Sequence, residues 1–276
     1  MNNFGNLLKF EFKKLKQRNI FKLIILCAII LPIITSLSAY FTVKENVDIQ
    51  PVYKSYAAVN YVIENDFFGP TMIIIFALST IIICEEFSKG TIKQLFTKPY
   101  KKDYHLLSKY IVVCCTVLLY SLIFVSISTL IFEVLYHFQN LNVPNEYLNQ
   151  DISYSIPKFM ILSIISVIPQ FLFYIVILFF WGALTNNPFV MIIYGFLLVI
   201  IDNALAMVLT NTEAIPSFIL NFNISVCCSN IDSYIFKEKM FEGANLWINI
   251  IVLFIYLSVF LSLGRRFFRN KEIQNI

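Results

Sequence analysis

Residues 159–181 read FMILSIISVIPQFLFYIVILFFW and contain no charged side chain. An α-helix rises about 1.5 Å per residue, and about 20 apolar residues are needed to cross the hydrocarbon core of a bilayer. A run of this length and composition is therefore predicted to form a transmembrane helix.

Similar runs recur along the chain and predict six transmembrane helices in total. They cover residues 21–41, 67–84, 110–132, 159–181, 189–209 and 246–263. The overall composition agrees, because 58% of the residues are hydrophobic and 14% are charged, whereas a soluble domain is about half apolar and about a quarter charged. The sequence predicts an all-α integral membrane protein, folded as a single transmembrane domain over residues 1–276.

The basic side chains are unevenly distributed around these spans. The N-terminal arm, the segment after the second span and the C-terminal tail carry 16 of the 21 Lys and Arg residues. An excess of Lys and Arg marks the cytoplasmic side of a membrane protein. We therefore predict that both termini and the segment after the second span are cytoplasmic.

Residues 1–20 have the pattern of an amphipathic helix. The apolar face consists of Phe4, Leu8, Phe12 and Leu15, and the opposite face carries Lys9, Lys13 and Lys16. This pattern predicts a helix that lies in the membrane interface with its basic face against anionic lipid head groups. The alternative is a short cytoplasmic arm whose charges only fix the topology.

Residues 211–244 form the longest predicted outer segment, between the fifth and sixth spans. Within it, residues 215–226 are apolar but too few to span a bilayer. This predicts a re-entrant or interfacial segment on the outer face. An ordered loop packed on neighbouring helices is an alternative interpretation.

Asp202 lies near the middle of the fifth predicted span, beside Asn203. An ionisable group at that depth is costly to bury and is therefore a functional candidate. It can line a translocation path or pair with a polar group across an interface between two permeases. The alternative is a carboxylic acid that only packs against neighbouring helices.

The cytoplasmic segment after the second span contains a short amphipathic stretch. Residues 85–102 read EEFSKGTIKQLFTKPYKK. Ile92, Leu95 and Phe96 are at helical spacing, and the stretch ends before Pro99, where a helix is expected to stop. An exposed helix with an apolar side needs a surface to pack against. The alternative is a basic loop whose Lys residues fix topology and touch lipid.

The order of residues in this segment is similar to that in a known family. The relevant residues are Glu86, Gly90, Thr91, Ile92, Leu95, Pro99, Lys101 and Lys102, with Lys109 at the next span. In this order and position they resemble the cytoplasmic signature of type-2 ABC exporter permeases. The likeness extends over the whole chain, although family members often have Arg where Lys101 and Lys102 stand, and Lys cannot form the bidentate pairs of Arg.

The resemblance implies an architecture and a set of partners. Residues 1–20 would be a connecting helix, and residues 85–109 would form a coupling segment that fits a groove on a separate ABC ATPase subunit. Two ATPase copies, which bind ATP and Mg, and a second permease copy or a homologous permease would complete the exporter. Membrane lipids are expected partners and nucleic acid is not. The implied location is the bacterial plasma membrane, with a multi-pass chain.

The sequence predicts no chemistry for this chain itself. It has no G-x-x-x-x-G-K-[ST] phosphate loop, so it is not expected to hydrolyse ATP or to bind a cofactor of its own. Its six Cys and two His residues form no disulfide or metal pattern, and the adjacent Cys227 and Cys228 fall in a predicted loop without an assigned role. We therefore predict no catalytic residue and no metal site.

Three functions are compatible with these observations. The first is a permease that exports a hydrophobic or amphipathic peptide antibiotic, toxin or drug by alternating access, powered by the partner ATPase. The second is a secondary transporter or channel driven by an ion gradient, which predicts polar residues along several spans. The third is an intramembrane enzyme, which requires clustered Asp, His or Ser residues. The coupling signature favours the first.

Overall fold

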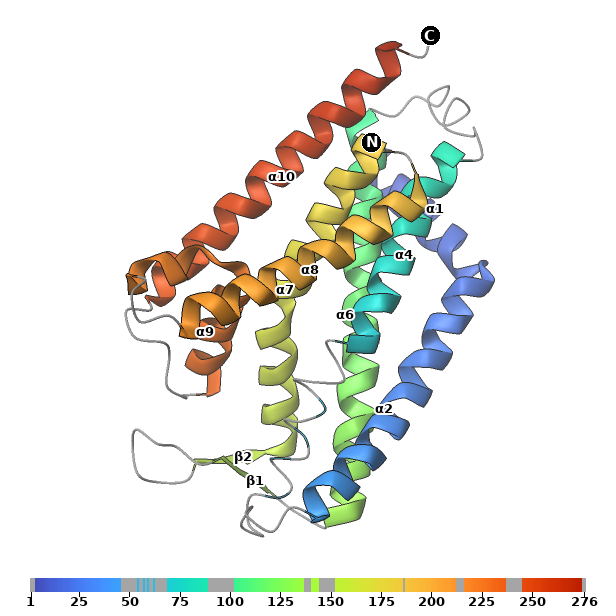
Figure 1. Cartoon of the computed structure of the whole chain (residues 1–276). Coiled ribbons are helices and arrows are strands. Elements are labelled where there is room, and N and C mark those ends of the chain that lie inside the picture. Colours follow the sequence, from blue (N-terminus) through green and yellow to red (C-terminus); the bar gives the residue numbers. More distant parts are fainter. Residues whose placement is uncertain are drawn as a thin grey trace.

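The structure of the chain, a computed structural model, is nearly all-helical (Figure 1). It describes residues 3–45, 54, 57, 59, 62, 69–88, 102–136, 140–143, 152–185, 187–211, 216–236 and 245–274. The long helices are α1 (Asn3–Lys16), α2 (Asn19–Glu45), α4 (Gly69–Ser88), α6 (Lys102–Tyr136), α7 (Ile156–Thr185), α8 (Pro188–Asn211), α9 (Ile224–Phe236) and α10 (Leu246–Gln274). A 3-10 helix, η3 (Ser217–Phe222), precedes α9, and two strands, β1 (Asn140–Val143) and β2 (Ile152–Ser155), lie between α6 and α7.

Five of the described helices are long and apolar enough to cross a membrane. They are α2, α6, α7, α8 and α10, and they coincide with five of the six predicted spans. The remaining prediction, residues 67–84, corresponds to α4, in which the apolar section Met72–Ile83 is shorter than a span. The chain is therefore a multi-pass membrane protein, while the second predicted span, residues 67–84, stays a prediction.

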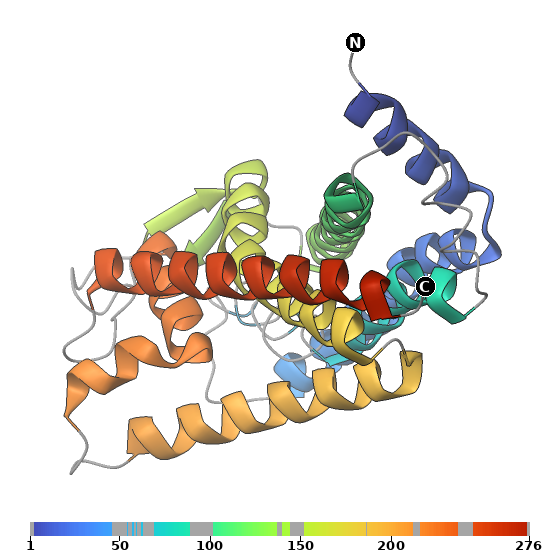
Figure 2. The same cartoon turned by 90° about the horizontal axis from the view of Figure 1, so that it is seen from above.

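The helix α7 is the centre of the fold. It packs against α4, α6, α8, α9 and α10, and every residue from Phe173 to Phe179 is buried. A helix that is apolar all round is expected in the interior. The helices α8 and α10 cross the bundle obliquely and lie on different sides of α7 (Figure 2), and most of their apolar side chains are exposed.

Two glycines allow close helix contacts around α7. A Cβ atom added at Gly182 would lie 2.8 Å from Cγ2 of Ile83 in α4, and one at Gly195 of α8 would lie 2.8 Å from Cδ2 of Leu178. Small residues permit such approaches between membrane helices. These two positions therefore fix how closely α4 and α8 pack on α7.

The elements sort to the two ends of the molecule (Figure 1). The helix α1, the C-terminal end of α10, the end of α4 and the beginning of α6 lie at one end. The β1–β2 hairpin lies at the opposite end. Both termini are thus at the same end of the protein, which is the arrangement that the even number of predicted spans requires.

The hairpin was not predicted from the sequence. The strands are antiparallel, with Leu141 paired with Tyr154 and Val143 paired with Ile152. Tyr154 is buried, its ring lies 6.2 Å from that of Phe236, and its hydroxyl donates to the Phe236 carbonyl at 3.4 Å. A four-residue strand is too short to show a clear alternation of apolar and polar residues. The hairpin is instead stabilised by the packing of Tyr154 on the end of α9.

Candidate functional site

Asp202 is the one charged residue in the sequence of α8, and its side chain is 6% exposed. Its Oδ2 accepts the backbone N–H of Ser225 at 3.1 Å and the Ser225 hydroxyl at 2.6 Å. The Tyr174 hydroxyl also donates to Oδ2, at 3.4 Å, and Nδ2 of Asn223 donates to Oδ1 at 3.1 Å. Asn203 joins this group, because its Oδ1 lies 2.9 Å from Oγ of Ser225. We call these five residues the Asp202 cluster.

The cluster forms the N-terminal cap of α9. Asn223 precedes the helix, and its Oδ1 accepts the backbone N–H of Val226 at 3.0 Å, as an N-cap residue does. Asp202 accepts a second N–H of the same first turn, that of Ser225. The N–H groups of the first turn of a helix have no partner within the helix itself. A carboxylate at this end also faces the positive end of the helix dipole. Asp202 of α8 thus caps a helix that begins 22 residues later.

The position of α9 explains why such a cap is needed. The cluster joins the start of α9 to Tyr174, in the middle of α7. At the other end of α9 the ring of Phe236 lies 5.4 Å from that of Phe159, near the start of α7. The helix α9 therefore runs along the first half of a helix with the length and composition of a membrane span. Backbone groups at membrane depth must find partners within the protein.

A second set of amide side chains fixes the start of α10. The Oδ1 of Asn245 accepts the backbone N–H of Trp247 at 3.0 Å, and the Asn245 N–H donates to Oδ1 of Asn221 at 3.3 Å. The thiol of Cys227 donates to the Asn221 carbonyl, with a sulfur–oxygen distance of 2.9 Å. The prediction that Cys227 and Cys228 lie in a loop was wrong, because both are buried within α9.

The sequence analysis found Asp202 and Asn203 but missed their partners. Asn223 stands just before α9, which begins at Ile224, and Asn at that place is a helix-start signal. The signal was hidden because residues 215–226 were interpreted as one apolar stretch. Pairing with Asp202 depends on the fold, since Ser225 is 23 residues away in the sequence.

At the end of the molecule with both termini, α1 meets α4 and α6. Lys109 is buried, and its Nζ donates to the Ile82 carbonyl of α4 at 3.0 Å. A small pocket beside it is lined by Glu11, Lys14, Leu15, Arg18, Ile82, Lys109 and Val112. Lys109, predicted at the edge of the cytoplasmic segment, therefore ties α6 to α4 within the protein interior.

The amphipathic face of α1 packs on protein. Leu15 is buried, and Phe4, Leu8 and Phe12 are partly buried, with the ring of Phe4 5.4 Å from that of Tyr104 in α6. The predicted basic residues Lys9, Lys13 and Lys16 are exposed. The apolar face of α1 thus lies against α6, and the location of this helix in the membrane interface stays a prediction.

Most of the predicted coupling residues lie outside the described part of the chain. These are Gly90, Thr91, Ile92, Leu95, Pro99 and Lys101. Glu86 lies in the last turn of α4, and Lys102 is the first residue of α6. Both helices extend into the predicted segment 85–109, so residues 102–109 continue α6. Within the described residues, no group of three or more His, Cys, Asp and Glu side chains could hold a metal ion.

Comparison with known families decides the class of protein. The profile of a family described as ABC-2 family transporter protein matches residues 7–202. The chain belongs to this family. The matched region runs from α1 to Asp202 and leaves out η3, α9 and α10. No curated protein matches the chain.

Membership of the ABC-2 family makes the chain a membrane-embedded component of a transporter. Subunits of this family generally carry no ATPase site of their own and normally pair with an ATPase subunit. The resemblance to type-2 ABC permeases that the sequence indicated is confirmed.

Proposed function

We propose that the chain is the membrane-spanning permease subunit of an ATP-driven ABC exporter. The observation that carries this proposal is the ABC-2 family match over residues 7–202. The chain spans the bacterial plasma membrane six times, with both termini cytoplasmic, and residues 85–109 bind the ATPase. ATP and Mg bind to the partner ATPase, which is present in two copies, and a second permease, either identical or homologous, completes the path.

The packing around Lys109 supports a coupling role for residues 85–109. The segment joins the end of α4 to the start of α6, and the bond from Lys109 to the Ile82 carbonyl fastens these two helices together. The helix α1 packs on α6 at the same end. A displacement of the coupling segment by the ATPase therefore moves α1, α4 and α6 together. Through the contacts of α4 and α6 with α7, it reaches the centre of the fold.

The Asp202 cluster supports transport driven by ATP over transport driven by an ion gradient. A carboxylate that binds and releases a coupling ion needs free acceptor sites facing a path. Asp202 instead accepts four hydrogen bonds from groups of its own chain. We assign it to holding α9 as a re-entrant helix between the fifth and sixth spans.

The exposed apolar side chains of α8 and α10 support a hydrophobic or amphipathic substrate. Phe189, Ile193, Leu197, Ile200 and Leu205 are all exposed along α8. Such a surface accommodates lipid, a second permease or a peptide antibiotic, toxin or drug, because each presents apolar groups. We infer that the exported substrate is an amphipathic peptide or drug.

Purification of the tagged chain in a mild detergent tests the assignment of a partner. We expect mass spectrometry to identify a bound soluble protein that contains a Walker A loop, in about equal amount to the chain. The same purification after deletion of residues 89–98 is the control, and it should recover the chain without that protein. Recovery of the intact chain alone, from cells in which the candidate ATPase is expressed, would count against the proposal.

A further inference from the structure

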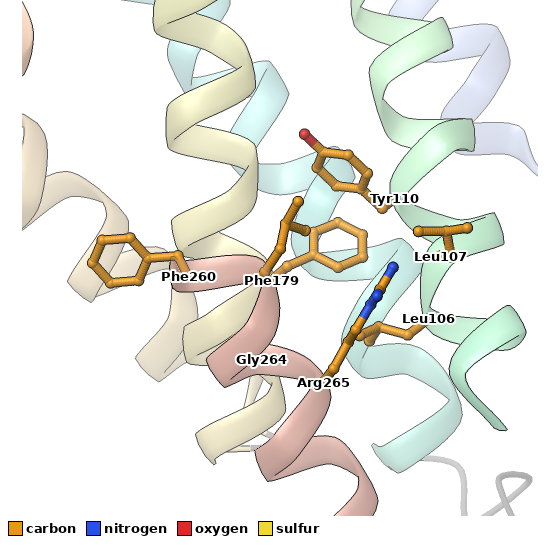
Figure 3. Close-up of a pocket in the computed structure, with 8 residues that line it drawn as sticks. Leu106, Leu107, Tyr110, Phe179, Phe260, Gly264 and Arg265 are labelled. Carbon is orange, nitrogen blue, oxygen red and sulfur yellow. The ribbon is translucent and has the colours of Figure 1, made fainter. Parts of the chain in front are cut away.

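A narrow apolar crevice lies where α6, α7 and α10 meet (Figure 3). Its apolar lining includes Leu106, Leu107, Phe179, Phe260 and Leu261. Phe179 and Leu106 are buried, whereas Leu107, Phe260 and Leu261 are partly exposed. Gly264 of α10 also lines the crevice, and a Cβ atom there would lie 3.7 Å from the Phe180 backbone. The crevice is thus a surface feature with a closed apolar floor and an open side.

In the part of the chain that the structure describes, one charged side chain lines this crevice. Arg265 of α10 is exposed, and its guanidinium extends toward Leu107 of α6 (Figure 3). Among the described residues, Arg265 has no hydrogen-bond or ion-pair partner. With respect to the described residues, the five N–H donors of the guanidinium are therefore available beside an apolar surface.

The position of Arg265 along α10 places it near the edge of the membrane. The helix begins at Leu246, so Arg265 lies about 28 Å along it. The hydrocarbon core of a bilayer is about 30 Å thick. The C-terminal part of α10, which carries Arg265, lies at the end of the molecule with both termini (Figure 1). A long Arg side chain there is expected to reach the lipid phosphates.

We propose that the crevice binds one anionic phospholipid. Arg265 pairs with its phosphate, because a guanidinium fork matches phosphate oxygens with two parallel hydrogen bonds. One acyl chain lies along the apolar walls formed by Leu107, Phe260 and Leu261. An anionic head group is favoured over a zwitterionic one because Arg265 supplies a positive charge and, among the described residues, no acidic side chain lines the crevice to attract a choline or amine group. The bound lipid would bridge α6 and α10.

Native mass spectrometry of the full chain with added phosphatidylglycerol tests this site. We expect the chain to retain one phosphatidylglycerol molecule in preference to phosphatidylcholine with the same acyl chains. Arg265→Gln should weaken this binding by about ten-fold or more, because hydrogen bonds to charged groups are lost. Arg266→Gln is the matched control, since it removes the same charge from the neighbouring position, which does not line the crevice. It should leave the binding within about two-fold.

A second variant tests the acyl-chain part of the site without changing its charge. Leu107→Trp fills the wall opposite Arg265 and should also lower phosphatidylglycerol retention, and free glycerol phosphate should not displace the lipid. Equal losses in the two Arg variants would overturn the proposal, because they would indicate unspecific charge attraction. Equal retention of both lipids, unchanged binding in Leu107→Trp, or displacement by glycerol phosphate would overturn it as well. The measurement needs neither ATPase nor transport, so its failure leaves the proposed function untouched.

Discussion

Asp202→Ala should lower the free energy of unfolding by about 2–3 kcal/mol, because four hydrogen bonds are lost and the N–H of Ser225 is left buried without an acceptor. For a protein of this size, that loss corresponds to a decrease in Tm of about 4–12 °C. Thermal unfolding of the purified chain in dodecyl maltoside measures the effect. Proteolysis should first cut near α9, because its N-terminal cap is removed.

Asn203→Ala is the matched control for this prediction. Asn203 is next in the sequence and exposed, and it touches the cluster through the Ser225 hydroxyl alone. We expect its Tm to change by less than about 2 °C. Asp202→Asn should fall between the two, because its amide oxygen still accepts a hydrogen bond while its NH₂ group faces donors. A Tm of Asp202→Ala equal to that of Asn203→Ala would refute the capping role and restore a role in the translocation path.

Replacing Gly90 and Thr91 with Trp should reduce stimulation of the partner ATPase by about ten-fold or more. The reason is steric, because a coupling segment that fits a groove cannot accept two bulky side chains without losing about 1.4 kcal/mol or more of binding free energy. ATP hydrolysis by the co-purified complex measures the effect. Membrane insertion and yield of the chain should be unchanged, since neither residue lies in a predicted span.

Gln94→Trp provides the control within the same segment. On a helix that begins at Ile92, after Gly90 and Thr91, Gln94 lies opposite Ile92, Leu95 and Phe96, so a bulky residue at this position points away from the docking face. ATP hydrolysis should stay close to that of the unchanged chain. If the Gly90 and Thr91 variant also retained full stimulation, the coupling assignment of this segment would be wrong.

The sequence predicted most of the long helices, because a run of about 20 apolar residues is what a membrane-spanning helix requires. It did not predict which helix is central. The helices α7 and α8 are both long and apolar, yet 56% of the α7 span is buried within the protein and 11% of the α8 span. Hydropathy measures affinity for an apolar environment, and lipid and protein interior are equally apolar. Packing partners therefore cannot be read from it.

The other differences between the prediction and the structure concern helix boundaries and tertiary contacts. The third span was predicted from residue 110, because Lys102, His105 and Lys109 interrupt the apolar pattern, whereas α6 begins at Lys102. The interior accepts Lys109 because the Ile82 carbonyl is in reach. The sequence identified Asp202 as a buried ionisable group. Its role in capping α9 could not be predicted, because the start of α9 comes close to Asp202 only in the folded protein.

ATP-driven uptake into inside-out membrane vesicles tests the central claim most directly. Vesicles from cells that express the chain with its partner ATPase would be given a fluorescent amphipathic peptide. Our account predicts that the peptide accumulates when ATP is added, and that changing the Walker A lysine of the partner abolishes accumulation. Accumulation driven by an ion gradient without ATP, and unaffected by that change, would contradict it and identify the chain as a secondary transporter.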